Sequence, residues 1–224
     1  MNATKIALLG ATLLAACSSS PTTTQVGTVP AVLSATSGGA QTGAVGGTVA
    51  PLVVTVTDAK GLPVPGVKIT FVGSAGVTVA DTAVPTDSAG RASSTFTLAD
   101  VPGTDTVVAT DAVDHLSVTF TATVIAGAPS LITIVSGAGQ TGVRGTMLAQ
   151  PLVVMVTDQF GNIAAGATVN WLTSAGTASA MSTVSDSTGK TSILYTLPAA
   201  AGVDTVTAAV YNANARVNFL VTGT

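Results

Sequence analysis

Apolar and polar residues alternate with a period of two over most of the chain beyond residue 30. The clearest run is 117–124, in which Val, Phe, Ala and Val alternate with Ser and Thr. Successive side chains of a strand point to opposite faces of a sheet, so this pattern predicts strands with one core face and one solvated face. An antiparallel sheet that is wet on one side is the expected result.

The pattern occurs twice, because the chain contains a long internal repeat. Gln-Thr-Gly at 41–43 recurs at 140–142, and Pro-Leu-Val-Val at 51–54 recurs at 151–154. Each copy is about 95 residues long and holds about seven strands, which is typical of an immunoglobulin-like sandwich. The fold class is therefore all-β, with two tandem immunoglobulin-like β-sandwich domains. In the first copy the strands are expected at 31–37, 52–58, 67–72, 77–83, 92–98, 105–110 and 117–124.

Four Asp-x-x-Gly segments separate these strands, at 58–61, 87–90, 158–161 and 186–189. Asp at the first position and Gly at the fourth favour a type I turn, in which the carboxylate accepts hydrogen bonds from nearby backbone N–H groups. These turns account for four of the Asp residues without any further function.

Charge and hydropathy exclude several classes of protein. Only 8% of the residues are charged, the net charge is −3, and no run of Lys or Arg is present. A nucleic-acid partner is therefore not expected, because phosphate binding requires a basic surface. Polar residues interrupt every apolar stretch beyond the N-terminus, and none approaches the roughly 20 apolar residues of a spanning helix.

The N-terminus combines an export signal with a candidate anchor. Lys5 precedes a short apolar segment that ends in Leu-Ala-Ala before Cys17, the only cysteine of the chain. This arrangement resembles the lipobox of bacterial lipoproteins, and the resemblance implies cleavage before Cys17 and acylation of that residue. The residue after the cysteine is Ser18 and not Asp, which resembles the lipoproteins of the outer membrane. The expected localisation is the cell envelope, lipid-anchored through Cys17, in the outer membrane and exposed at the surface.

Segments of both copies resemble bacterial Ig-like domains of the invasin/intimin type (group 1). The match is carried by Val-Thr-Asp-Gln-Phe-Gly-Asn at 156–162, by Ala-Gly-Ala-Thr-Val at 165–169, and by the later segments 186–191 and 204–208. The resemblance implies Ig-like domains that act as spacers in adhesive proteins. Ile163 and the Leu-Pro pair at 62–63 depart from the family pattern at the turn.

The chain is predicted to divide into four parts. Residues 1–16 are a signal peptide and residues 17–28 an anchor with a flexible tether. Residues 29–126 and 127–224 are two bacterial Ig-like domains.

Catalytic chemistry is not expected. His115 is the only histidine, and its neighbour Asp114 would point to the opposite face of a strand, so the two cannot form part of a triad. No His/Cys cluster for zinc is present. Asp105, Asp111 and Asp114 come closest to a calcium site, near one end of the first sandwich, but solvated loop aspartates are the preferred interpretation. No enzyme activity, cofactor or metal is predicted.

Aromatic residues supply the remaining candidates. Phe71 and Trp171 hold equivalent strand positions, so both are predicted to fill the cores. Phe160 lies at a turn tip, where it is a candidate contact for a partner or for the neighbouring domain. Tyr195 and Tyr211 are expected in strands, and an outward ring on either would suit glycan stacking.

The sequence thus favours a surface-exposed lipoprotein that serves as a structural or adhesive Ig-like module in cell adhesion or cell-envelope interaction. The alternative is an accessory lipoprotein that binds carbohydrate or protein through loops of the second domain. In both cases the predicted partners are the membrane, through the lipid on Cys17, and an unknown protein or glycan ligand.

Overall fold

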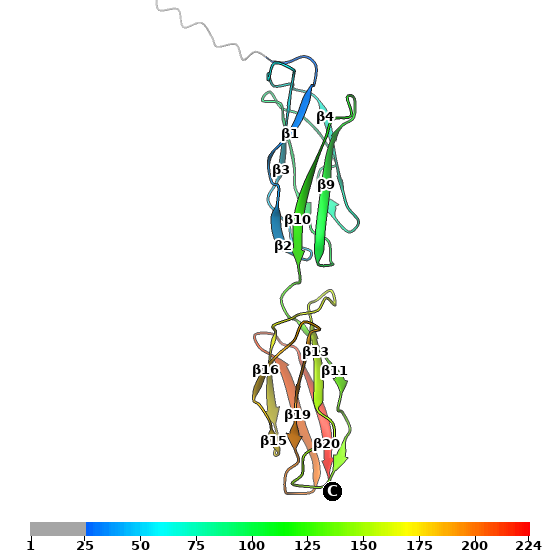
Figure 1. Ribbon diagram of the computed structural model, residues 1–224, viewed down its shortest axis with the longest axis vertical. Helices are drawn as coiled ribbons and strands as arrows, with labels where there is room; N and C mark the ends of the chain where they lie inside the picture. Colours follow the sequence, from blue (N-terminus) through cyan, green and yellow to red (C-terminus); the bar gives the residue numbers. More distant parts are fainter. Residues whose placement is uncertain (1–25) are drawn as a thin grey trace, which may run out of the picture.

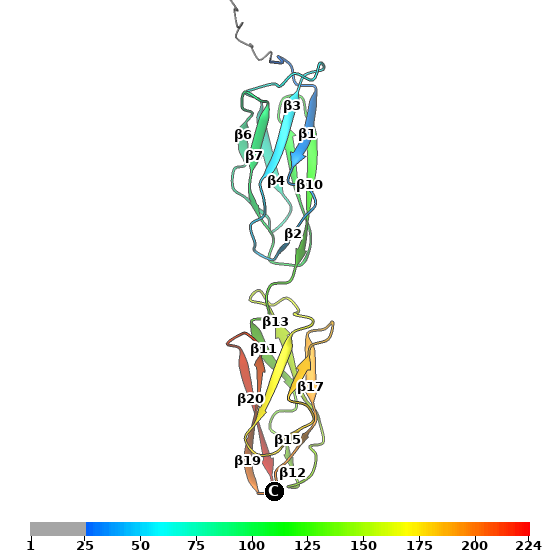
Figure 2. The same cartoon turned by 90° about the vertical axis from the view of Figure 1, so that its left-hand side faces the viewer.

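The computed structural model describes residues 26–224, and these form two β-sandwiches that follow one another along the long axis (Figure 1, Figure 2). Each sandwich contains one three-stranded and one five-stranded sheet, with a small two-stranded sheet beside them. The all-β, two-domain prediction is confirmed. The predicted signal peptide, Cys17 and most of the predicted tether lie outside the described residues. No helix in residues 26–224 is long and apolar enough to cross a membrane.

The N-terminal sandwich contains ten strands. Its three-stranded sheet has the order β1-β3-β7, its five-stranded sheet the order β2-β10-β9-β4-β6, and β5 pairs with β8. The strands are β1 (Val32–Ser37), β2 (Gln41–Ala44), β3 (Leu52–Thr57), β4 (Lys68–Gly73), β5 (Thr78–Val79), β6 (Ala83–Pro85), β7 (Arg91–Ser94), β8 (Phe96–Thr97), β9 (Gly103–Asp111) and β10 (Ser117–Ile125).

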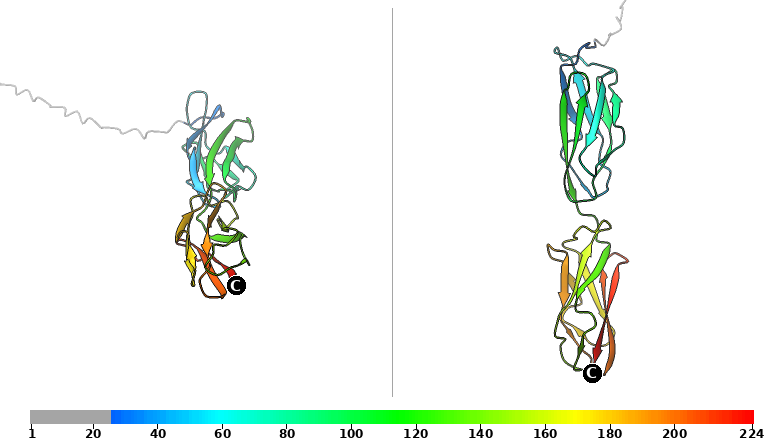
Figure 3. Two further views of the ribbon diagram at one scale, coloured as in Figure 1. Left: turned by 60° about the horizontal axis from the view of Figure 1, so that its bottom comes forward. Right: turned by 90° about the vertical axis from the view of Figure 1, so that its right-hand side faces the viewer.

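The C-terminal sandwich repeats this topology, with sheets β11-β13-β17, β12-β20-β19-β14-β16 and β15-β18. A linker over residues 126–130 joins it to the first (Figure 3). Its strands are β11 (Leu131–Ser136), β12 (Thr141–Gly142), β13 (Leu152–Thr157), β14 (Thr168–Thr173), β15 (Thr177–Ala178), β16 (Ser182–Val184), β17 (Lys190–Ile193), β18 (Tyr195–Thr196), β19 (Gly202–Val210) and β20 (Arg216–Gly223).

The strand count exceeds the predicted seven because two predicted strands are divided and because β2 was not predicted. The segment after β1 turns at Gly38, whose φ is +91°, and continues as β2 in the opposite sheet. There β2 pairs with β10 in parallel, so not all pairings are antiparallel as the sequence suggested. The predicted strands 77–83 and 92–98 are likewise broken, into β5 and β6 and into β7 and β8.

Each sandwich has its own core, built from the inward-facing residues of both sheets. Phe71, Phe96 and Phe120 lie in the core of the first, and Trp171 and Phe219 in the core of the second. The indole N–H of Trp171 donates to Thr183 Oγ1 at 2.8 Å, and its ring centroid lies 6.1 Å from that of Phe219. The prediction that Phe71 and Trp171 are core residues is confirmed.

The four Asp-x-x-Gly turns form as predicted. In each, the Gly N–H donates to the carbonyl of the Asp, and the Asp carboxylate accepts two further backbone N–H groups. Every fourth-position glycine has a positive φ, from +71° at Gly90 to +87° at Gly161. Asp at the start and Gly at the end are therefore explained by local geometry.

Candidate functional site

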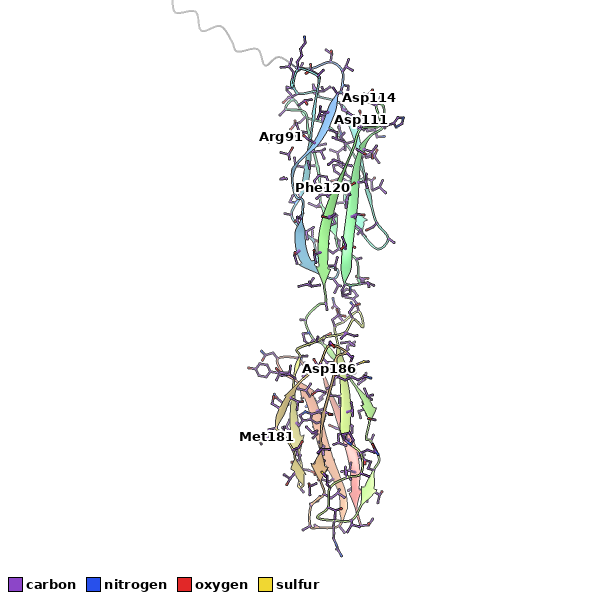
Figure 4. The ribbon with its side chains drawn as sticks, viewed as in Figure 1. Arg91, Asp111, Asp114, Phe120, Met181 and Asp186 are labelled. Atoms are coloured by element: carbon purple, nitrogen blue, oxygen red, sulfur yellow. The ribbon has the colours of Figure 1, made fainter. Side chains whose placement is uncertain are left out.

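The structure separates the residues that would be needed for catalysis or calcium binding. Asp105 and Asp111 lie near opposite ends of β9, about 20 Å apart at the rise of an extended strand. The idea that they cluster at one end of the sandwich is therefore wrong. Asp111 is fully buried, and Asp114 and His115 are exposed on the loop that follows (Figure 4). Within residues 26–224, no group of three or more His, Cys, Asp or Glu could hold a metal ion.

Phe160 lies at the joint between the two sandwiches. Gly46, in the loop after β2, has φ +66°, and a Cβ placed there would lie 2.9 Å from Cζ of Phe160. A larger residue at position 46 would therefore collide with the ring. Phe160 remains 42% exposed, so one part of the ring contacts the first sandwich and another faces solvent. Its role as a contact for a separate partner stays a prediction.

Polar contacts complete this joint. Asn162 Nδ2 donates to the carbonyl oxygen of Asp100 at 2.7 Å, and the linker N–H of Gly127 donates to Asp158 Oδ2 at 2.9 Å. Asp158 is fully buried. Burial alone would raise the pKa of Asp158, but the hydrogen bonds from Asn162, Gly127 and Phe160 outweigh it and lower the pKa. One turn of the second sandwich thus holds both the linker and the end of the first.

The two tyrosines separate into a core residue and a surface residue. Tyr195 in β18 is buried, and its hydroxyl donates to Asp204. Tyr211 lies outside the strands, directly after β19, and is 59% exposed. The expectation that Tyr211 belongs to a strand is wrong, because β19 ends at Val210 and the chain turns there toward β20. Tyr211 is therefore the tyrosine that could contact a ligand.

A polar hollow lies on the outer face of the five-stranded sheet of the second sandwich, beside the loop that begins at Tyr211. It has a volume of about 360 Å³. The register places Leu172, Thr207 and Asn218 side by side across β14, β19 and β20, with Asn170, Ala209 and Arg216 in the next row. The residues that line the hollow are Leu172, Thr207, Ala209, Ala213, Asn214, Ala215 and Arg216.

Sequence reasoning did not identify this set of residues. The two rows come from three strands that are far apart in the sequence, and only the register brings them together. An available signal was the replacement of the hydroxyl residues Ser117 and Thr119 in the first copy by Arg216 and Asn218 in the second.

A second hollow, of about 510 Å³, lies beside β14 over the buried Trp171. Leu172 and Met181 are exposed at its edge, and Met181 protrudes from the side of the sandwich (Figure 4). A similar hollow of about 380 Å³ lies in the first sandwich, over Phe71. Because both copies have such a hollow, it does not distinguish the second sandwich from the first.

No known protein-family profile matches the chain, and no curated protein matches its sequence. The structure of the chain does resemble solved structures. The Escherichia coli adhesin FdeC has 19% identity, the alignment covers 88% of this chain and 67% of that one, and the TM-score is 0.55. Yersinia pseudotuberculosis InvD has 19% identity over 86% of this chain and 57% of that one, with a TM-score of 0.43. The D0-D1 domain of intimin has 16% identity over 87% and 98%, with a TM-score of 0.35.

The likeness to FdeC identifies the fold, and at 19% identity it identifies the fold alone. It agrees with the strand order and paired sheets described above. The chain therefore consists of two sandwiches with the Ig-like fold of bacterial adhesin domains, the fold that its turn motifs indicated.

Proposed function

We propose that the chain is an exported lipoprotein, anchored through Cys17, whose two Ig-like sandwiches form an adhesive or structural module on the outer surface of the cell envelope. The division at 29–126 and 127–224 belongs to this proposal, with 17–28 as anchor and tether. The fold likeness to the adhesin FdeC supports it. So does the lipobox-like sequence that ends at Cys17.

The observation that carries the structural part is the joint. Asn162 makes a hydrogen bond to Asp100 across it, Gly127 ties the linker to Asp158, and Phe160 contacts the loop at Gly46. These contacts hold the second sandwich at the far end of the first. A module of this kind keeps a binding surface away from the membrane to which its N-terminus is attached.

The alternative function, a carbohydrate- or protein-binding accessory lipoprotein that uses the second domain, is favoured by one observation. Only the second sandwich carries an exposed tyrosine in the loop between the last two long strands, where the first has Ala112. The two functions are compatible, since an adhesive module also requires a ligand.

The anchor is tested by expressing the full chain and Cys17→Ala in a bacterial host and separating membranes from soluble fractions. We expect the native protein in membranes and Cys17→Ala in the soluble fraction, because the acyl chains supply the membrane affinity. Ser20→Ala is the matched control and should stay in membranes. Recovery of Cys17→Ala with the lipid would refute the anchor.

Surface exposure and binding are tested separately. Protease added to intact cells should degrade the native protein if it faces outward. Residues 26–224 and their Phe160→Ala variant are then applied to an array of glycans and host-matrix proteins. Weaker binding by Phe160→Ala would place the contact at the joint turn, whereas equal binding would remove Phe160 from the contact and leave other surfaces.

A further inference from the structure

The outer faces of the two five-stranded sheets have different chemistry although their backbones correspond. In the first sandwich, one row across β4, β9 and β10 is Val72, Val108 and Thr119, and the next is Thr70, Thr110 and Ser117. These side chains are aliphatic or bear a single hydroxyl. They provide neither charge nor amide groups.

In the second sandwich, the same positions carry a guanidinium and two amides. The rows are Leu172, Thr207 and Asn218, and Asn170, Ala209 and Arg216. At strand and residue spacings of about 5 and 7 Å, the six side chains cover a patch on the order of 7 by 10 Å. The hollow lies over four of these six residues, Leu172, Thr207, Ala209 and Arg216, with Asn214 from the following loop at its edge. Asn170 and Asn218 lie beside it in the same rows.

The polar groups of the patch are available to a ligand. Thr207 Oγ1 donates to Asn218 Oδ1 at 2.9 Å, and this bond leaves the amide N–H groups of Asn218 to donate elsewhere. The side chains of Asn170, Asn214 and Arg216 take part in none of the side-chain hydrogen bonds described for residues 26–224. Three amides and one guanidinium therefore face solvent as hydrogen-bond donors.

The exposed charged residues around this patch favour an anionic ligand. No carboxylate lines the hollow. In the second sandwich Asp158 and Asp204 are buried, so Asp186 is its one exposed acid, whereas Arg144, Lys190 and Arg216 are all exposed. The first sandwich exposes four acids, Asp81, Asp87, Asp100 and Asp114, against three bases, Lys60, Lys68 and Arg91. An anionic ligand is therefore attracted to the second sandwich rather than the first.

We infer that this patch, defined by Asn170, Leu172, Thr207, Asn214, Arg216 and Asn218, binds the sugar rings of an acidic saccharide. The guanidinium of Arg216 pairs with a sugar carboxylate in two parallel hydrogen bonds, and the amides donate to ring hydroxyls. Leu172 offers an apolar surface to the ring, and Tyr211 stands at the start of the adjoining loop. The inference deepens the proposed adhesive function by naming its ligand class.

The test uses residues 26–224, which contain both complete sandwiches, and isothermal titration calorimetry. The probe is an oligogalacturonate of six sugars, and maltohexaose is its uncharged counterpart. We expect binding of oligogalacturonate at one site, at least about tenfold tighter than maltohexaose. Added NaCl should weaken the interaction, because it screens the exposed guanidinium. Equal affinity for both sugars, or no binding of oligogalacturonate, would overturn the inference.

The position of the site is tested with substitutions taken from the first sandwich. Arg216→Ser and Asn218→Thr introduce Ser117 and Thr119, which the same strand geometry already accommodates. Arg216→Ser should weaken binding about tenfold, while Arg144→Ser removes an equal charge from the opposite end and should change it less than about twofold. A similar loss in both variants would show a diffuse charge effect and refute this site. Melting temperatures confirm that each variant is folded.

A gain-of-function variant separates binding from stability. Thr70→Asn, Val108→Thr, Ser117→Arg and Thr119→Asn together transfer the polar sheet residues of the patch to the first sandwich. The stoichiometry for oligogalacturonate should rise from about one to about two, a result that no structural role of Arg216 would produce. An unchanged stoichiometry contradicts the claim that these groups form the site. Because these assays use the soluble chain, their failure is distinct from failure of the Cys17 anchor.

Discussion

The two sandwiches satisfy an equivalent buried aspartate in different ways. In the first, Asp105 Oδ2 accepts the backbone N–H of Ala99 at 2.8 Å. The equivalent of Ala99 in the second is Pro198, which has no N–H to donate. There the hydroxyls of Tyr195 and Ser174 and the backbone N–H of Gly176 donate to Asp204. The first sandwich has Phe96 at the position of Tyr195.

One fold can therefore exchange the donor that is lost at Pro198 for the hydroxyl of Tyr195, which acts beside the other donors to this buried carboxylate. The exchange also constrains a neighbour. A Cβ on Gly176 would collide with the Tyr195 hydroxyl and with the Thr196 carbonyl oxygen, so position 176 must remain Gly, the residue that Gly76 provides in the first sandwich. Sequence differences between the copies are therefore grouped by contact and are not independent.

The largest expected effect is on the core of the second sandwich. Trp171→Ala should lower its free energy of unfolding by about 3–5 kcal/mol, because the side chain is buried and its loss leaves a cavity. Circular dichroism in denaturant is the measurement, since Trp171 is the only tryptophan and its fluorescence disappears with it. The first sandwich, with its separate core, should unfold as before. A loss below about 1 kcal/mol would place the ring at the surface.

The exchange at the buried aspartate predicts a smaller effect. Tyr195→Phe should cost about 1.5–3 kcal/mol, since it removes a hydrogen bond to a buried carboxylate. Adding Pro198→Ala restores the N–H that the first sandwich uses and should recover part of this loss. The double-mutant cycle in denaturant unfolding measures the coupling. Additive effects of the two substitutions would show that Asp204 does not accept the restored donor.

The buried Asp158 at the joint predicts a pH-dependent contribution to the stability of the second sandwich. The pKa of Asp158 is lowered in the folded protein, so its ionised form stabilises the fold above the unfolded pKa of about 3.9 and loses this effect as pH falls through the folded pKa. Asp158→Asn should therefore cost about 1–2 kcal/mol at pH 7 and much less at strongly acidic pH. Thermal unfolding of both proteins across this range gives the comparison. A cost independent of pH would assign it to packing.

The smallest expected change in stability comes from Phe160→Lys, which gives the second sandwich the residue found at Lys60 of the first. Phe160 is partly exposed, so the free energy of unfolding should change by less than about 0.5 kcal/mol. The angle between the sandwiches should nevertheless become more variable. Small-angle scattering measures this, and an unchanged profile would mean that Asn162 and Gly127 hold the joint without the ring.

Local features were predictable because their physics is local. The Asp-x-x-Gly turns need only a carboxylate and a residue that tolerates positive φ, and the position of Trp171 follows from alternation along one strand. Likewise, the repeat of Gln41 at Gln140 reflects the same contacts, since each side chain bonds the carbonyl of a glycine three residues before it. The sequence pattern therefore identifies strands, turns and cores.

Features that depend on distant residues were not predictable. The switch of sheets after β1 depends on Gly38, where a side chain would meet the backbone of Pro51 and Leu52. The contact of Phe160 with Gly46 depends on how two domains meet. The saccharide patch requires the register of three strands, which no single segment of sequence contains.

The parallel pairing of β2 with β10 has a mechanical consequence. In the lipoprotein proposed above, a force that stretches the chain between the N-terminal anchor and a ligand on the second sandwich draws β2 and β10 in opposite directions along their lengths. Their hydrogen bonds then lie across the direction of pull and must break together. The second sandwich is loaded in the same way, through the bonds that Thr222 and Thr224 donate to Gln140 and Gly142 and the bond that Arg144 donates to Thr224. Under tension both sandwiches should therefore resist through hydrogen bonds that break together, rather than open one bond at a time.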